Sequence, residues 1–287
     1  MNRKLIKQGG TGLTVYVPKK WADRLKLKPG DEVSIEEDGN NLILAPESVL
    51  KEKTIKLDAT KLTENSLRIS LSLLYWQGYN KIEITNKNKF SFLGINKVVD
   101  NFTGMVITEQ TDHKVTVQNT IKENSEDLDK IINKLFITVK YMFSYLLDNF
   151  SKNLENDSEI LELRTSILKQ GNYCQKLIFV NNFGKEKTYE YVVLVLMLKK
   201  MSGSLFFLAK NKLHLKKTET YLKKSFGWFE DLHNSYLKKD STTSLEIYEL
   251  LNKEKLKLYQ EQKENVIFGG MIEHMFSLSL RVSSINL

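Results

Sequence analysis

The positions of proline divide this 287-residue chain into two parts that fold under different constraints. The three prolines are Pro18, Pro29 and Pro46, and residues 47–287 contain none. Proline is excluded from helix interiors because it lacks a backbone N–H and its ring clashes with the preceding turn. Its absence permits long helices in the second part without requiring them. The first part is rich in glycine and β-forming residues, which favours short strands and turns.

Residues 1–48 predict a small β module. Val33 and Ile35, followed by Leu42 and Leu44, have the two-residue spacing that gives a hairpin one apolar face. So few strands cannot enclose a core, and we therefore expect two copies of the module to pair. The predicted strands are Lys4–Lys7, Leu13–Val17, Glu32–Glu36 and Asn41–Leu44, with a turn at Asp38-Gly39-Asn40, a helix between Pro18 and Pro29 that buries Trp21, Leu25 and Leu27, and a turn at Pro29-Gly30-Asp31.

Residues 49–122 predict a second domain of mixed α/β structure. Leu67, Leu71 and Leu74 have helical spacing, and Gly78 ends that helix. The other predicted elements are strands at Thr54–Leu57, Lys81–Thr85, Met105–Glu109 and Lys114–Gln118 and a helix at about Phe90–Phe102.

Residues 123–287 predict an all-α domain, which makes the fold class α+β. Apolar residues recur every three to four positions from Leu128 to Phe150, the spacing of an amphipathic helix. Similar stripes make six helices, which divide into two three-helix units at about 123–213 and 214–287. The further stripes are Ile160–Phe179, Tyr189–Leu213, Leu222–Leu237, Leu245–Tyr259 and Ile267–Ile285.

The bulk sequence predicts a cytoplasmic protein without membrane insertion. Its longest stretch without a charged side chain is Ile69–Asn80, which is shorter than the roughly 20 apolar residues of a membrane-spanning helix. The first ten residues lack the apolar segment of a secretory signal. Cys174 is the single cysteine, which excludes a disulfide within one chain.

No pattern of catalytic residues is evident, so we expect neither an enzyme nor a cofactor. The four histidines are scattered without metal-ligand spacing. Gly9, Gly10 and Gly12 precede a predicted strand, whereas a phosphate-binding loop opens a helix. Cys174 lies on an apolar helical stripe, which favours a buried structural thiol over a nucleophile.

Charge is divided unevenly within the amino-terminal module. Eight basic residues and the single acidic residue Asp23 fall in residues 1–28, whereas the charged residues of 31–47 are all acidic. This division predicts one basic surface, which suits a polyanion such as DNA, although ordinary solvated lysines would give the same count. The basic residues are Arg3, Lys4, Lys7, Lys19, Lys20, Arg24, Lys26 and Lys28; the acidic ones are Asp31, Glu32, Glu36, Glu37, Asp38 and Glu47.

The module resembles the AbrB/MazE/SpoVT-type swapped-hairpin DNA-binding family. The resemblance rests on a Gly-rich turn between two strands, the Val17-Pro18-Lys19 strand end, a short helix, and the segment Leu27-Lys28-Pro29-Gly30-Asp31-Glu32-Val33. It implies that two chains interlock and bind double-stranded DNA through the first strand, the turn and the helix start. The turn lacks the arginine of many members, so Thr11 and backbone amides are expected to contact phosphate there. The implied DNA-binding residues are Arg3, Lys4, Lys7, Thr11, Lys19, Lys20 and Arg24.

The layout of the rest of the chain is similar to archaeal-type PhoU-related phosphate uptake regulators. Those proteins carry Glu-x-x-x-Asp metal motifs, but Lys199 and Gly203 occupy the first matching pair of positions here. The second pair keeps Glu273 and replaces the aspartate with Ser277. A lysine repels a cation, so we expect no metal site. The resemblance implies a role in phosphate uptake and partners such as a phosphate transporter ATPase or a sensor kinase.

Together these observations predict a homodimeric transcriptional regulator that binds DNA through its basic module. The alternative is a PhoU-like protein–protein adaptor that uses the hairpin module only to dimerise.

Overall fold

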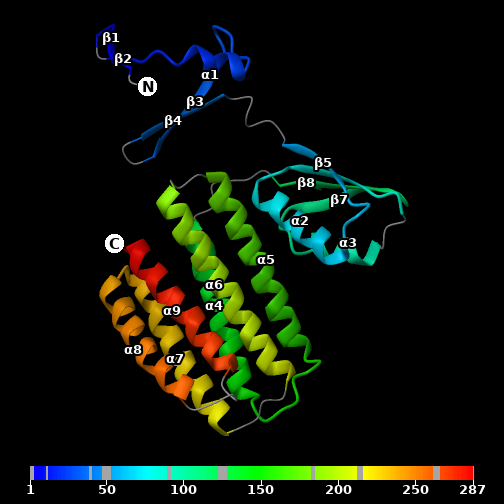
Figure 1. Ribbon diagram of the computed structural model, residues 1–287, viewed down its shortest axis with the longest axis vertical. Coiled ribbons are helices and arrows are strands. Elements are labelled where there is room, and N and C mark those ends of the chain that lie inside the picture. The colour runs from blue at the N-terminus through cyan, green and yellow to red at the C-terminus, as the bar shows by residue number, and fades with distance from the viewer. Residues whose placement is uncertain are drawn as a thin grey trace. The chain divides into compact units, whose positions relative to one another are not determined.

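The computed structural model describes residues 3–10, 12–38, 41–46, 53–88, 92–121, 128–181, 185–211, 216–260 and 266–286. The chain forms two compact units, residues 1–53 and 54–287 (Figure 1). The first contains small β hairpins, and the second contains a mixed sheet and a multi-helix region, so the α+β class is confirmed. The α/β and helical segments, which are predicted from the sequence to be separate domains, belong to the same compact unit.

The first unit contains two antiparallel hairpins. β1 (Ile6–Gln8) pairs with β2 (Gly12–Thr14), and Gly9, at a φ of +71°, makes the turn that joins them. Both strands are shorter than the sequence predicts, because pairing stops where Ile6 meets Thr14. β3 (Val33–Asp38) pairs with β4 (Asn41–Pro46), and α1 (Lys19–Arg24) lies between the two hairpins in the chain.

The register of the second hairpin confirms the predicted apolar face. Ile35 lies opposite Leu44, and Val33 and Leu42 are each two residues away along the same strands. Alternate residues of a strand point to the same side, so these four side chains share one face of the hairpin. Gly39 and Asn40 of the predicted turn lie outside the described residues.

The second unit begins with a four-stranded sheet in the order β5-β6-β8-β7. β5 and β6 are parallel, and the other pairs are antiparallel. Ile82, Ile84, Val115 and Val117 point to one face, which α2 and α3 cover (Figure 1). The elements are β5 (Thr54–Asp58), α2 (Glu64–Trp76), β6 (Lys81–Thr85), α3 (Phe92–Val99), β7 (Met105–Gln110) and β8 (Lys114–Asn119).

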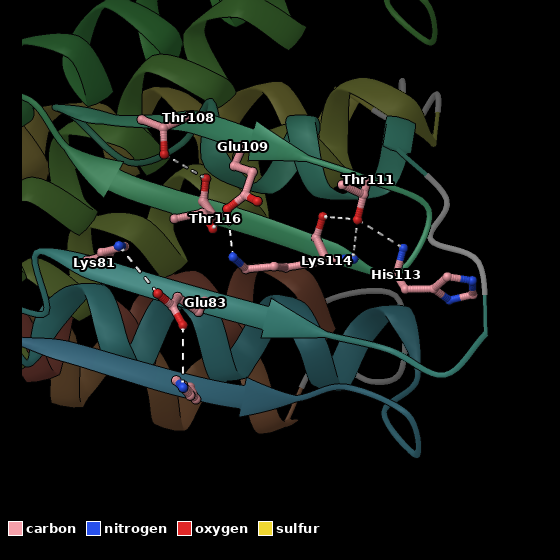
Figure 2. A network of polar contacts seen from close by, with 9 residues as sticks. Lys81, Glu83, Thr108, Glu109, Thr111, His113, Lys114 and Thr116 are labelled. Carbon is pink, nitrogen blue, oxygen red and sulfur yellow. Dashed lines mark hydrogen bonds and ion pairs between the residues drawn. The ribbon is translucent and has the colours of Figure 1, made fainter.

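The opposite face of this sheet is polar (Figure 2). Glu83 lies 3.3 Å from the Lys81 ammonium and 4.0 Å from that of Lys56 on the neighbouring strand. Lys114 donates to Glu109 over 2.7 Å, and the Thr116 hydroxyl donates to the same carboxylate. Such partly exposed pairs add little stability, but they explain why the sheet buries only one face against helices.

In the described part of the chain, helices α4 to α9 complete the second unit. α4, α5 and α6 pack against one another, as do α7, α8 and α9, and the two sets meet where α6 packs on α9 and α4 on α7. Phe136 and Phe143 of α4 contact Phe229 of α7 at ring-centroid distances of 5.6 and 5.3 Å. The helices are α4 (Leu128–Asp148), α5 (Ser158–Asn181), α6 (Lys185–Lys210), α7 (Lys216–Lys238), α8 (Ser241–Gln260) and α9 (Val266–Asn286).

One described helix, α6, is long and apolar enough over Lys187–Lys210 to cross a membrane by length and composition alone. The lack of a long uncharged stretch predicts no such segment, but the charged residues of α6 do not prevent it from meeting this criterion. Half of the most apolar stretch of this helix is buried, and α6 packs against α4, α5 and α9. The central helix of a bundle has this same composition.

A histidine is buried between the two sets of helices. His233 of α7 is 4% exposed and stacks on Phe136 of α4 at a centroid distance of 4.8 Å. Its Nε2 lies 2.7 Å from Asn133 Oδ1, a hydrogen-bond acceptor. Burial, with a smaller contribution from Lys140, lowers the pKa of His233 to about 4. The folded protein therefore keeps this ring neutral.

We predict that acid destabilises the helical region through His233. The unfolded ring has its ordinary pKa of 6.5, so between pH 6.5 and 4 the unfolded state binds more protons and stability falls as pH falls. Urea unfolding followed by helical circular dichroism should show a free energy of unfolding lower at pH 5 than at pH 7 by about 2 kcal/mol from this group. His233→Gln should remove most of that difference; an unchanged pH dependence would contradict the assignment.

Candidate nucleic-acid interface

Six of the seven residues predicted to bind DNA are described, and all six are exposed. They fall into two groups in the first unit, and their contact with DNA stays a prediction. Thr11, the seventh, lies outside the described residues. The first group is Arg3 and Lys4, which precede β1, and Lys7 within it; the second is Lys19, Lys20 and Arg24 of α1.

Helix α1 separates its cationic side chains from its apolar ones. Lys20 and Arg24 are four residues apart and therefore share a face. Trp21, Ala22 and Leu25 are half-buried, whereas the charged residues of the helix are exposed. The helix thus presents positive charge on the side that does not pack.

The two lysines at the start of α1 do not stabilise the helix. The first turn contains no acidic residue, and Pro18 at the N-cap makes no side-chain hydrogen bond. The positive end of the helix dipole disfavours cations at this position. Lys19 and Lys20 are therefore exposed cations that do not stabilise the helix, and their charge is available to a bound polyanion.

Backbone geometry fixes the path from α1 to β3. Lys26 adopts a φ of +56°, and the Leu27 N–H donates to the Ala22 carbonyl over 3.0 Å, which ends the helix. Gly30 has a φ of +95°, and the Lys28 N–H donates to Asp31 Oδ2 over 2.7 Å. The predicted Pro29-Gly30-Asp31 turn is confirmed. Of the acidic half, Asp31 and Glu32 are exposed, and Glu47 lies outside the described residues.

The first unit also exposes its apolar side chains. None of the side chains described in residues 3–46 is buried. The prediction that Trp21, Leu25 and Leu27 are buried is wrong for the single chain: all three are half-buried, because one copy supplies too little structure to cover them. The strongly exposed ones are Leu5, Leu13, Tyr16, Ile35 and Leu42, at 61–68%, with Ile6, Val15, Val17 and Val33 at 36–44%.

In the second unit, the first position matched to the metal motif is occupied by the positively charged side chain of Lys199. Lys199 Nζ donates to Asn172 Oδ1 and Gln175 Oε1, each over 2.8 Å. In the described part of the chain, no three His, Cys, Asp or Glu side chains lie close enough together to hold a metal ion. Cys174 is fully buried, as predicted, and burial raises the pKa of its thiol to about 12.

Comparison with known proteins identifies the first unit alone. Residues 6–51 match the family described as "Antidote-toxin recognition MazE, bacterial antitoxin". No curated protein and no solved structure shows significant similarity to the chain. The match covers β1 to β4, where the sequence resemblance was found, and domains of this type typically bind DNA as dimers. The amino-terminal unit is therefore a MazE/AbrB-type domain, attached to an unidentified helical region.

Proposed function

We propose that this protein is a homodimeric transcriptional regulator that binds double-stranded DNA through its first unit. The observation that carries the proposal is a MazE/AbrB-type domain in which exposed cations and exposed apolar side chains occur together. Lysine and arginine contacts to phosphate supply most of the sequence-independent affinity for DNA. The residues proposed for those contacts are Arg3, Lys4, Lys7, Thr11, Lys19, Lys20 and Arg24.

Dimerisation is the second element of the proposal. The shared face of Val33, Ile35, Leu42 and Leu44 is apolar, and Ile35 and Leu42 are more than 60% exposed in one chain. A second copy offers the same face, so a two-fold interface covers both at once. A two-fold protein also matches a two-fold DNA site.

We further propose that the regulator responds to a signal related to phosphate uptake. We also propose that the protein is cytoplasmic and is not an enzyme. Support comes from the layout of the helices, in which α4–α6 and α7–α9 form two mutually packed sets of three, as the resemblance to PhoU-related regulators implies. A phosphate transporter ATPase or a sensor kinase is the proposed protein partner. Genome-wide mapping of bound DNA tests this directly, because the target genes would then include phosphate transport genes.

The alternative adaptor uses the same exposed apolar face for dimerisation and makes no use of the cations. Deleting residues 1–48 distinguishes the two functions. A regulator loses DNA binding while its second unit keeps its protein partner. An adaptor has no DNA binding to lose and changes only its oligomeric state.

We predict that Lys19→Ala/Lys20→Ala weakens DNA binding and its dependence on salt. Each phosphate contact contributes about 0.9 to the slope of log affinity against log salt, so loss of four lysines per dimer should reduce the slope by up to about 3.6. Fluorescence anisotropy with a labelled duplex at several salt concentrations measures it. The substitutions should not unfold α1, since both lysines oppose the helix dipole.

A charge-matched control uses two exposed lysines of the second unit, Lys134→Ala/Lys253→Ala. This variant should bind DNA with the wild-type slope. Equal slopes for both double variants would show that net charge, and not the proposed surface, governs binding.

We also predict that Ile35→Lys/Leu42→Lys produces monomers. Analytical ultracentrifugation of the wild type should give twice the chain mass of 33.3 kDa, and the variant the single mass. Burial of one such side chain contributes about 1.5–3 kcal/mol, and the variant replaces four per dimer with charges. Leu161→Lys, at a 42% exposed position on α5, should leave the mass unchanged; a wild type of single mass would refute dimerisation.

A further inference from the structure

A pocket lies where the α/β segment meets the helices. Its volume is about 220 Å³, enough for roughly seven water molecules. α2 contributes Arg68, Leu73 and Trp76, and α5 and α6 contribute Asn172 and Lys199. Residues far apart in the sequence therefore line one space.

The charged side chains that line this pocket are Lys199 and Arg68, two cations that make no ion pair in the described part of the chain. Lys199 donates to the amide oxygens of Asn172 and Gln175, which are neutral and buried. Arg164, which is not among the residues that line the pocket, donates to the Lys199 carbonyl over 2.9 Å and to the Ser202 hydroxyl. Among the described residues, none of Lys199, Arg68 and Arg164 makes an ion pair with a carboxylate.

The position of Lys199 is fixed by its surroundings. Its aliphatic stem crosses Gly171, where an added Cβ would lie 2.6 Å from Lys199 Cδ. Its ammonium lies 5.0 Å from the centre of the Trp76 ring. Burial first, and then the charges of Arg164 and Arg68, lower the pKa of Lys199 to about 8, so the group is still mostly cationic at neutral pH.

The rest of the lining is mostly apolar, with Ser72 and Asn101 as its other polar members. Leu168, Phe102 and Val98 line it, and Ile69 and Leu73 of α2 are each 46% exposed at its side. The indole N–H of Trp76 is buried and has no hydrogen-bond partner in the described part of the chain. An occupant with one polar end and one apolar end would satisfy both parts of this lining.

We propose that this pocket binds a small organic anion, with its carboxylate or phosphate group against Lys199 and Arg68 and its apolar part along Trp76 and Leu73. Such an occupant would supply the negative charge that these cations lack and would cover the exposed side chains of Leu73 and Ile69. The pocket belongs to the second unit and does not depend on the proposed binding of DNA.

Isothermal titration calorimetry on the full chain at pH 7 tests the proposal with phenyl phosphate and benzoate. At least one should bind saturably, and the tighter of the two identifies the acidic group. Benzyl alcohol, which lacks the charge, and inorganic phosphate, which lacks the apolar part, should each bind at least about tenfold more weakly. Equal affinity for either control, or saturable binding of neither anion, would overturn the proposal.

Lys199→Met keeps the length of the side chain and should weaken binding at least about tenfold, since a hydrogen bond to a charged group contributes about 1.5–3 kcal/mol. Lys200→Met is the matched control, because Lys200 is adjacent, exposed and outside the pocket lining. If Lys199→Met does not fold, Arg68→Gln and Leu73→Glu provide the test at exposed positions, and both should weaken binding. Wild-type affinity in these variants, or equal losses for Lys199→Met and Lys200→Met, would refute the site.

Discussion

The first unit exposes large apolar side chains that a single copy does not cover. No described side chain of this unit is buried. The most exposed, at 61–68%, are Leu5, Leu13, Tyr16, Ile35 and Leu42. Each square ångström of apolar surface removed from water stabilises a structure by about 25 cal/mol, and one copy of this unit gains little of that energy. Its folding and its association are therefore expected to be the same event. A second copy that covers these side chains also doubles every cation beside them.

Helix α1 connects that burial to DNA binding. Its half-buried residues, Trp21 and Leu25, face the packed side, whereas Lys20 and Arg24 face outward. Any interface that covers Trp21 consequently orients the cations of the same helix. The side chains proposed to hold the dimer and those proposed to contact phosphate are thus different, but the position of the second set would depend on the first.

Local sequence patterns predicted most of the elements because they encode burial directly. The alternation of Val33 and Ile35 gave the correct hairpin face, and the three-to-four spacing from Leu128 matched α4. Ends were less accurate where neighbouring structure decides them: β2 stops at Thr14, although apolar residues continue to Val17, because β1 offers no further partner. Full burial of Trp21 was predicted wrongly for a similar reason, since the apolar spacing of α1 does not show how little of the single chain packs against it.

Lys199 was understood from the sequence only as a lost metal ligand. Its surroundings involve Trp76 on α2 and Asn172 on α5, and no local pattern indicates that these helices meet. The only indication in the sequence of this environment is that Lys199 lies within the apolar stretch of α6. A polar residue in such a stretch needs tertiary partners, but the sequence does not say which ones.

The same helical region shows how a partly buried cation is neutralised elsewhere. Arg281 of α9 donates to both oxygens of Glu190 on α6, at 2.9 and 2.7 Å, and the two side chains are only 22% and 18% exposed. Lys199 is on the same helix as Glu190, but its ammonium donates hydrogen bonds to two neutral amide oxygens and to no carboxylate in the described part of the chain. A hydrophobic residue of similar size would avoid the desolvation of an unpaired ammonium. Stability alone therefore does not account for the lysine, whereas an anionic occupant of the adjoining pocket does.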